Sequence, residues 1–531
     1  MRAALIALLC VGCGSRGSVS FVIRAPSYEP LNPIDERVTE FSVKRMDGTI
    51  VAVASQTASS GERLPLGVLG TTTTPVDLQV SLLSGSALLG LARVKDVTIQ
   101  PAVQRDYPVE VRKPLITIGS TIPTFTGETL PGNAPLPGQI LDPSTFADLA
   151  TLPGGPRLPM RTTATASTWD GRFLLAAGMG GLSVIDTGTG ATVGVAALNF
   201  EAARVVVGAR DSAVAVLDPN GAVMLYTDVA ALTTNPATAS VKRVDLAVAQ
   251  RTAVFSPDGK TLYVLSGLPV DPCSPTAGVP APNTITALGI DGMKLGQWGF
   301  SGFVADFAID ATGGRFMLSD VPNDRVTALD LSAPFGQAAP IKVTDANCPS
   351  ALRLAGNELF VVTNNKSMDF DPPAFEMLHV TLRSGQVTKL YFSSPIYDNV
   401  DVPDMPTPGG TTSLGFRFIP VSLVAQDMAL TPDGTRAVFT IRARYQEINA
   451  PLTVFTNPCR ADYEIVEYGV YDMDTRSGQS TYRPGAQIIG ANMGGRDTCI
   501  TCQTLGGTLP FTCLSRTGDR PAGLATVFGG T

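Results

Sequence analysis

Short runs of alternating apolar and polar residues, separated by tight-turn signals, extend along most of this chain. The clearest example lies around Pro257–Gly259. Proline presets φ and glycine accepts a positive φ, so the chain is expected to reverse there. Leu262 and Val264 then alternate with polar neighbours at the two-residue period of a strand. A third strand is predicted over Asn283–Leu288, and an Asp-Gly pair turns it into a fourth over Met293–Phe300.

The same order of strand, turn and strand returns in five more places. These copies cover residues 170–186, 204–226, 309–330, 356–382 and 431–472. A four-stranded unit repeated every 40–50 residues or so is typical of a β-propeller, in which neighbouring blades cover each other's faces. Six blades are read directly, and residues 485–531 with Leu152–Thr168 are expected to complete a seventh. The alternative is a set of unrelated hairpins in a sandwich, which the shared turn order disfavours.

Three of the units carry a more specific signal. The matching residues are Leu262–Val264 with Asn283–Ile285, Val361–Asn365, and Leu182–Asp186. They resemble the YVTN-type propeller blades of bacterial surface and periplasmic proteins. The resemblance covers roughly Arg161–Arg483 and implies the architecture of that region. It implies little about function, because propellers carry many unrelated activities.

The region before the repeats predicts a second all-β domain. At 531 residues the chain is long enough for two or more domains. Strand candidates at regular spacing, with a hairpin signal at Asp47-Gly48, predict an immunoglobulin-like β-sandwich over residues 18–120, serving as a spacer. Residues 121–159 are rich in Pro, Gly and Thr and lack strand periodicity, so they are interpreted as a semi-rigid linker. The predicted fold class is therefore all-β, with a sandwich followed by a propeller over residues 160–531.

The first residues predict the compartment. A short basic start precedes the apolar run Ala3–Val11, which is of signal-peptide length and too short to span a bilayer. Residues 1–13 resemble a bacterial lipoprotein signal peptide, cleaved before Cys13, whose thiol is then lipidated. Cys10 departs from the usual leucine, and an ordinary secretory signal is the alternative. Gly14, rather than aspartate, follows the cysteine, which by this resemblance favours lipid anchoring at the outer membrane of the bacterial cell envelope.

Charge and cysteine content agree with an exported protein. With 39 Lys and Arg against 46 Asp and Glu, the net charge is −7, which argues against nucleic acid as a partner. Beyond the first 13 residues the cysteine number is even, which in an exported chain predicts disulfides. The six candidates are Cys273, Cys348, Cys459, Cys499, Cys502 and Cys513. Cys499 and Cys502 have redox-motif spacing, but no βαβ context surrounds them, and a zinc site suits an oxidising compartment poorly.

Residues with catalytic or metal-binding potential are few. His379 is the only histidine, which excludes a multi-histidine metal site, and a lone strand histidine is usually a packing residue. Asp398, Asp401 and Asp404 lie in one predicted insertion and could hold Ca²⁺ through their oxygens. Their spacing matches no EF-hand, and exposed acidic residues are usually only solvated. No other cofactor is predicted.

Unequal connections between the strands predict a binding face. The turns between first and second strands, and between third and fourth, are tight, whereas the other connections carry long insertions. These insertions are Gly267–Pro282, Asn364–Met377, Ser393–Leu423 and Arg442–Glu464. They are expected on one rim of the ring, where long loops on a rigid scaffold commonly bind partners. Aromatic residues in them predict a contact surface for a protein or glycan. They are Phe370, Phe375, Tyr397, Phe416, Phe418 and Tyr445.

Two classes of function are compatible with this sequence. The first is a lipid-anchored binding or scaffold module for an envelope protein or polysaccharide. The alternative is a periplasmic propeller enzyme that performs metal-assisted lactonase-like hydrolysis or lyase-like elimination. Such an enzyme needs several inward-facing His, Asp, Glu or Asn residues where the blades begin. Segments such as Ala253–Phe255 and Met428–Leu430 offer small and apolar residues instead, which favours binding.

Overall fold

A computed structural model of the chain describes most of the protein outside its first 17 residues and several connections. The described residues are 18–34, 38, 40–45, 50–54, 63–66, 75–85, 87–98, 104–119, 138–142, 147–159, 161–178, 180–246, 248–267, 283–332, 335, 339–364, 374–393, 397–400, 416–432, 434–447, 462–483, 487–492, 503–504, 507–508 and 525–526. Among these residues, no helix is long and apolar enough to cross a membrane.

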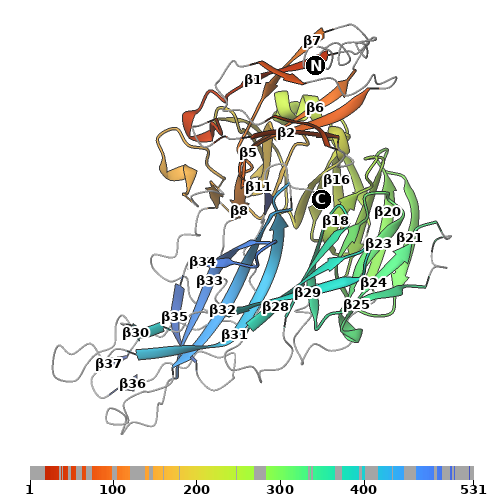
Figure 1. Ribbon diagram of the computed structural model, residues 1–531. Helices are drawn as coiled ribbons and strands as arrows, with labels where there is room; N and C mark the ends of the chain where they lie inside the picture. The colour runs from red at the N-terminus through yellow and green to blue at the C-terminus, as the bar shows by residue number, and fades with distance from the viewer. Residues whose placement is uncertain are drawn as a thin grey trace, which may run out of the picture.

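The N-terminal region consists of two sheets around one core (Figure 1). In the first sheet β1 pairs antiparallel with β4 and parallel with β7, and the second has the order β3-β2-β5-β6. Phe21, Phe41 and Val80 are among the buried residues that fill the space between them. The elements are β1 (Ser18–Arg24), η1 (Glu29–Leu31), β2 (Glu40–Arg45), β3 (Ile50–Ala54), β4 (Arg63–Leu66), β5 (Val76–Ser84), β6 (Ala87–Val97) and β7 (Gln104–Glu110).

Six antiparallel sheets of four or more strands follow in the described part of the chain, each built from consecutive strands. The first two contain β10 (Ala164–Ser167), β11 (Phe173–Gly178), β12 (Gly181–Asp186) and β13 (Thr192–Ala196), then β14 (Arg204–Val207), β15 (Val214–Asp218), β16 (Ala222–Tyr226) and β17 (Lys242–Asp245). The third and fourth contain β18 (Gln250–Phe255), β19 (Thr261–Ser266), β20 (Asn283–Gly289) and β21 (Lys294–Phe300), then β22 (Val304–Ile309), β23 (Arg315–Asp320), β24 (Arg325–Asp330) and β25 (Ile341–Asp345). Short helices accompany them: η2 (Leu149–Thr151), η3 (Ala209–Asp211), α2 (Val229–Thr234), η4 (Pro236–Thr238) and η5 (Val321–Asn323).

The fifth and sixth sheets differ in size. The fifth contains β26 (Pro349–Ala355), β27 (Glu358–Thr363), β28 (Ala374–Thr381) and β29 (Gln386–Ser393). The sixth contains β30 (Tyr397–Val400), β31 (Phe416–Leu430), β32 (Arg436–Glu447), β33 (Asp462–Asp474), β34 (Ser480–Arg483) and β35 (Gln487–Asn492). A two-stranded hairpin, β36 (Gln503–Thr504) and β37 (Gly507–Thr508), follows.

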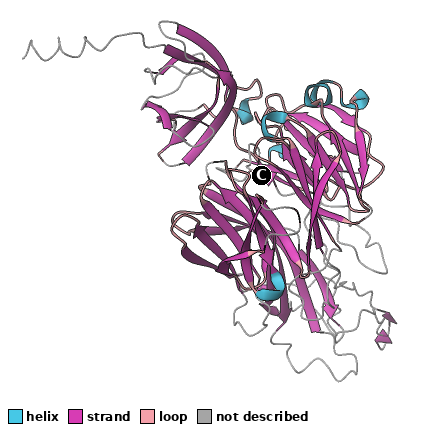
Figure 2. Ribbon diagram, turned by 90° about the vertical axis from the view of Figure 1, so that its right-hand side faces the viewer, coloured by secondary structure: helices cyan, strands magenta, loops and turns pink. Residues whose placement is uncertain are grey.

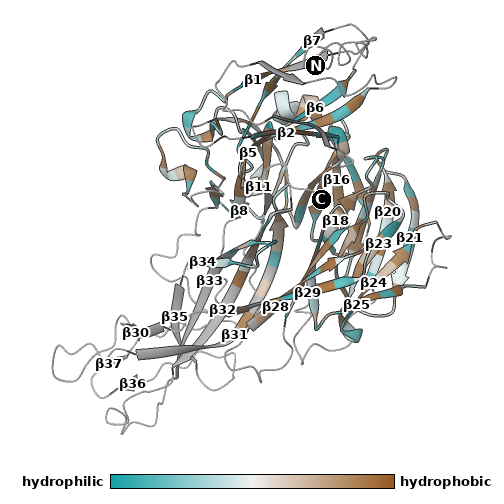
Figure 3. Cartoon of the chain, viewed as in Figure 1, coloured by the Kyte–Doolittle hydropathy of each residue, from teal (hydrophilic) through white to brown (hydrophobic). Residues whose placement is uncertain are grey.

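The inner strands of these sheets form a closed ring. Each contacts the next in the order β10, β14, β18, β22, β26 and β31. Between β31 and β10 lies β38 (Ala525–Thr526), which contacts both and pairs with β8 (Ile116–Ile118), itself paired with β9 (Gln139–Leu141). Buried clusters join every sheet to its neighbour around the ring. Figure 3 shows hydrophobic residues along the strands of these sheets. This arrangement confirms the prediction of a β-propeller.

The tight turns form as the local sequence predicts. In the third sheet the Asp258 carboxylate accepts bonds from the Ser256 hydroxyl (2.6 Å) and the Lys260 N–H (3.1 Å). Gly259 has a φ of 69°, a left-handed conformation that a side chain would disfavour. The first sheet repeats this arrangement, with Thr168 and Asp170 in the same roles. A polar side chain two residues before an Asp-Gly pair therefore stabilises each of these reversals.

Two regions differ from the sequence-based expectation. Ala525–Thr526 pairs with Ile116–Ile118 rather than with any part of Leu152–Thr168, so segments assigned to the sandwich and linker supply strands next to the ring. The predicted insertions Ser393–Leu423 and Arg442–Glu464 are partly strand. Their ends extend β31, β32 and β33 into a long ribbon that runs away from the N-terminal sheets (Figure 1). Long antiparallel pairing satisfies backbone hydrogen bonds that an irregular loop would leave to water.

The contribution of β8 to the ring gives a testable prediction. Ile116 is fully buried and packs with Leu141, Ala429 and Val438 of the sixth-sheet interface. Replacing it in Ile116→Ala should lower the free energy of unfolding by about 2–5 kcal/mol, because the cavity cannot fully collapse. Chemical denaturation monitored on the propeller tryptophans would measure this. The control Ile341→Ala removes a side chain that is 70% exposed and should change stability by about 0.5 kcal/mol or less. Equal stability of the two variants would contradict the role assigned to β8.

Candidate functional site

A cavity of about 390 Å³ lies inside the ring. It is lined by residues of β10, β14, β18, β22, β26 and β31 and by Arg93 of the N-terminal sheet. Its wall is mainly small and apolar, with a few charged and hydroxyl side chains among them. This mixture of apolar wall and isolated polar groups is typical of small-molecule binding sites.

Three residues of the cavity lining, and Asp427, occupy equivalent positions of different sheets. These residues are Arg204, Thr252, Asp306 and Asp427. In each case the residue four positions later donates the backbone N–H that closes the turn between the first and second strands of the sheet. The ladders of the fourth and sixth sheets shift register beside Asp306 and Asp427. Such bulges bend a strand and redirect its side chains, here into the channel.

Arg204, Asp306 and Asp427 form, together with Arg353, one ion-pair network across the channel, which we call the channel network. Arg353 bonds Asp306 through Nη1 (2.7 Å to Oδ2) and Asp427 through Nη2 (2.6 Å to Oδ1). Arg204 Nη1 lies 2.9 Å from the second oxygen of Asp427. The network thus connects β22, β26, β31 and β14, and its two arginines balance its two carboxylates.

Further hydrogen bonds hold Asp306 in place, and local charge shifts the pKa values of Asp427 and Arg353. Asp306 also accepts the N–H groups of Phe307 (2.9 Å) and Leu352 (3.0 Å). Burial by itself would raise the pKa of Asp427, but the charges of Arg204 and Arg353 outweigh it and hold that pKa below the ordinary value. Burial likewise opposes the charge of Arg353, yet its two carboxylate partners raise its pKa. Both carboxylates of the network are thus bonded to guanidinium groups.

The N-terminal sheet covers one side of the channel mouth. Arg93 donates to the Trp169 carbonyl (3.0 Å), and burial lowers the pKa of Arg93 to about 10. Lys95 lies 5.2 Å above the Trp169 ring and pairs with Asp211 (2.9 Å). Asp211 also accepts a hydrogen bond from the backbone N–H of Trp169. Burial raises the pKa of Asp211 above its usual range. Two cations, one aromatic ring and one carboxylate therefore join the two domains at this mouth.

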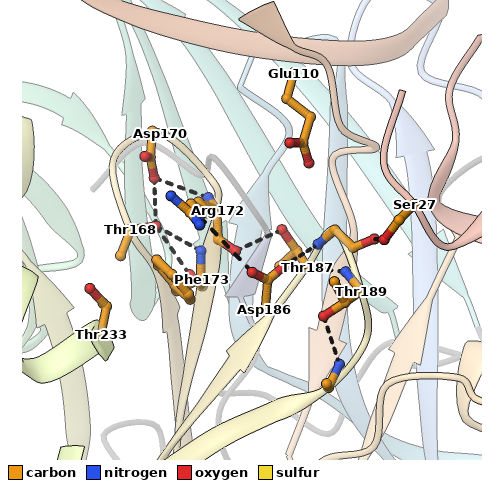
Figure 4. Close-up of polar contacts among 12 residues, drawn as sticks. Ser27, Glu110, Thr168, Asp170, Arg172, Phe173, Asp186, Thr187, Thr189 and Thr233 are labelled. Carbon is orange, nitrogen blue, oxygen red and sulfur yellow. Dashed lines mark hydrogen bonds and ion pairs between the residues drawn. The ribbon is translucent and has the colours of Figure 1, made fainter. Parts of the chain in front are cut away.

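A second set of contacts joins the domains at the turns of the first sheet. Arg112 donates to the Thr187 hydroxyl (2.6 Å) and pairs with Glu110 (2.5 Å). Figure 4 shows Ser27 beside the turn that contains Thr187, and its hydroxyl donates to the Gly188 carbonyl (3.3 Å). In the turned view of Figure 2 the N-terminal sheets lie against one end of the ring. The N-terminal domain is therefore docked on the tight-turn end of the ring.

The predicted aromatic contact surface is only partly described. Phe375 corrects the prediction, because it is 1% exposed and stacks on Phe392 at 4.6 Å inside the core between the fifth and sixth sheets. Phe370 lies outside the described residues. Tyr397, Phe416, Phe418 and Tyr445 lie on β30, β31 and β32 of the long ribbon, where Tyr397 is opposite Phe418 in the register.

Of the cysteine and metal candidates, the structure describes a few. Cys348 is completely buried and disulfide-bonded. Asp398 lies on β30, and no group of potential metal ligands occurs among the described residues. The remaining candidates lie outside those residues: Cys13, Cys273, Cys459, Cys499, Cys502, Cys513, Asp401 and Asp404. His379 is a packed strand residue, stacked on Phe360 (4.6 Å) and bonded to Glu358 (2.8 Å).

Sequence reasoning missed the channel network. The signal was present as single charged residues within apolar strand segments, such as Asp306 before Phe307 and Arg353 between two leucines. Their partners are 47 to 223 positions away in the chain. The equivalent strand positions of Arg204, Asp306 and Asp427 become visible only when the first turns of the sheets are aligned.

Comparison with known proteins adds little to this picture. No family model matches the chain, and no curated protein matches it. Among solved structures, one similar to it is the β-propeller domain of Cps50 (Swd1) from Myceliophteria thermophila. That likeness has 11% sequence identity and a TM-score of 0.35, and covers 62% of this chain and 96% of the other. The propeller assignment rests on the ring of inner strands.

The lowered pKa of Asp427 gives a prediction about pH. Because the folded pKa lies below the ordinary value of about 4, the network contributes its full stability above pH 4 or so. That contribution is lost as the pH falls through the folded pKa. Asp427→Asn should cost about 3 kcal/mol at pH 6, and the deficit should shrink toward pH 3, as measured by urea unfolding.

The matched control is Asp345→Asn. Asp345 pairs with Lys342 at the surface and its side chain is 82% exposed. Removing this charge should change the free energy of unfolding by about 0.5 kcal/mol or less. A deficit of Asp427→Asn that stays constant from pH 7 to pH 3 would contradict an ionised network.

Proposed function

We propose that this protein is a lipid-anchored, extracytoplasmic propeller of the bacterial cell envelope that acts as a binding or scaffold module. Its architecture in this proposal is an immunoglobulin-like sandwich followed by a seven-bladed propeller of YVTN type. The three-stranded sheet β38-β8-β9 supports the seventh blade, because β38 contacts both β31 and β10. The two N-terminal sheets around one core support the sandwich.

The observation that favours binding over catalysis is the neutral channel network. Both buried carboxylates are bonded to arginines, and Asp306 accepts two backbone N–H groups as well. A metal-assisted hydrolase or lyase would need such carboxylates to bind a metal ion or to transfer a proton. A scaffold needs them only to hold its sheets together. The enzyme alternative is therefore the weaker of the two hypotheses.

The face proposed for partners is the end of the ring opposite the N-terminal domain. The strand ends that flank three of the insertions are Ser266 and Asn283, Thr363 and Ala374, and Glu447 and Asp462. In an antiparallel sheet these ends are opposite the tight turns on which the N-terminal domain is docked. The ribbon of β31, β32 and β33 extends in the same direction, away from β1 and β6 (Figure 1). An envelope protein or polysaccharide could then bind without displacing the N-terminal domain.

The anchor is tested by cysteine substitution. Cys13→Ser in the full chain should move the protein from the membrane fraction to the soluble extracytoplasmic fraction, because the lipid acceptor is lost. The control Cys10→Ser keeps the acceptor and should leave the protein in the membrane fraction. Immunoblots of fractionated cells measure both. Retention of Cys13→Ser in the membrane would refute the lipoprotein proposal.

The partner face is tested by capture of envelope components on the purified full chain. Replacing residues 401–415, which connect β30 to β31, with a short glycine-serine linker should abolish recovery of the partner. The control Met293→Ala changes a residue that is 63% exposed in a tight turn at the opposite end, and it should leave recovery unchanged. Loss with Met293→Ala and retention with the replaced connection would place the partner on the other face.

A further inference from the structure

The cavity inside the ring is lined by an arginine side chain that uses only some of its N–H donors in the channel network. Within the described part of the chain, Arg204 bonds to Asp427 alone, and it does so through Nη1. Its Nε and Nη2 hydrogens remain for the cavity that Arg204 lines. The side chain is 28% exposed, whereas that of Arg353, held by two carboxylates, is 13% exposed. Arg353 is thus fixed by the network, while Arg204 has donors to offer a ligand.

We propose that this cavity is a binding site for a small molecule bearing one carboxylate or phosphate group, which Arg204 receives. A planar guanidinium with free donors matches the oxygen pair of such a group. The site lies outside the loop face of the proposed function and does not depend on it.

The other charges around the cavity agree with an anionic ligand. Arg93, from the N-terminal domain, also lines the cavity; it donates to the Trp169 carbonyl and to Gln79, and interacts electrostatically with Asp211 and Asp170. The Asp310 carboxylate lines the cavity as well, but one of its oxygens accepts from Thr312 and Gly314 in its own turn. Among the charged residues that line the cavity, the three arginines Arg93, Arg204 and Arg353 outnumber the two carboxylates Asp306 and Asp310. The lining therefore carries a net positive charge, which favours an anion.

The size and wall of the cavity limit the ligand further. A volume of about 390 Å³ lies at the small end of ligand sites. Val206, Val254, Ala308 and Leu430 supply apolar wall, and Thr252 supplies a hydroxyl at the position equivalent to Asp306. A compact molecule with one anionic end and a partly apolar body fits this lining.

The route into the cavity is set by the docked domain. The lining continues to Pro257, Ala311 and Gly356, in the first turns of the third, fourth and fifth sheets. The contacts of the N-terminal domain described above fall on turns of the first and second sheets. The cavity therefore opens beside the docked domain, at the same end of the ring, and the partner face at the other end stays free.

The test is isothermal titration calorimetry on the purified full chain carrying Cys13→Ser. The probes are inorganic phosphate, succinate and benzoate. Phosphate against the other two distinguishes a phosphate ligand from a carboxylate ligand, and succinate against benzoate distinguishes a polar from an apolar ligand body. At least one probe should bind with 1:1 stoichiometry, and Arg204→Gln should weaken it at least tenfold. The control Arg325→Gln removes an arginine paired with Asp320 on β24, away from the cavity lining, and should leave binding unchanged.

A second variant covers the case in which Arg204→Gln does not fold. Thr252→Asp leaves the channel network intact and places a carboxylate in the cavity wall, so it should also weaken the probe at least tenfold. The proposal is overturned if no probe binds the parent protein, or if Arg204→Gln and Arg325→Gln weaken binding equally. Either result would leave the capture experiment on the opposite face unaffected, so failure of this site and failure of the proposed function are distinguishable.

Discussion

The structure depends on each sheet burying both of its faces against its two neighbours. A four-stranded antiparallel sheet has two faces, and a sheet without neighbours would leave apolar residues such as Leu175, Val216 and Phe316 in water. Here a buried cluster joins every consecutive pair around the ring. The gap between the sixth and the first sheets of the ring is filled by Ile116, Ile140 and Leu141. These residues come from a segment that precedes the first sheet of the ring in the chain. Ring closure therefore makes residues from both ends of the chain part of one folding unit.

The channel network follows from this closure. Inner strands converge on the ring axis, so Arg204, Asp306 and Asp427, at equivalent positions of three strands, meet Arg353 of a fourth strand there. Arg204 and Asp427 belong to sheets that are far apart in sequence yet meet across the channel. A buried charge without a partner is strongly unfavourable, and the alternation of Asp and Arg around the axis removes that cost. The same arrangement bonds both carboxylates of the network to arginines.

The N-terminal domain changes the character of the site. A domain on a flexible linker would leave both channel mouths open. Instead Arg93, Lys95 and Arg112 contact turns of the first two sheets, and the segment that follows them supplies β8. The two ends of the ring are therefore unequal. One end holds the docked domain and the cavity entrance, and the other has the strand ends that flank the insertions.

The sequence by itself determined the all-β class, the repeated unit and its tight turns. These depend on short-range chemistry: the two-residue period of strands and the Asp-Gly pairs, as at Asp258 and Gly259. It also showed His379 to be an ordinary strand residue. Only the tertiary structure decided that Phe375 belongs to the core, that Ile116 lies beside the ring, and that Arg204, Asp306, Arg353 and Asp427 form one network. The physical reason is that these contacts join residues tens to hundreds of positions apart, and their partners are set by ring closure, which no local pattern encodes.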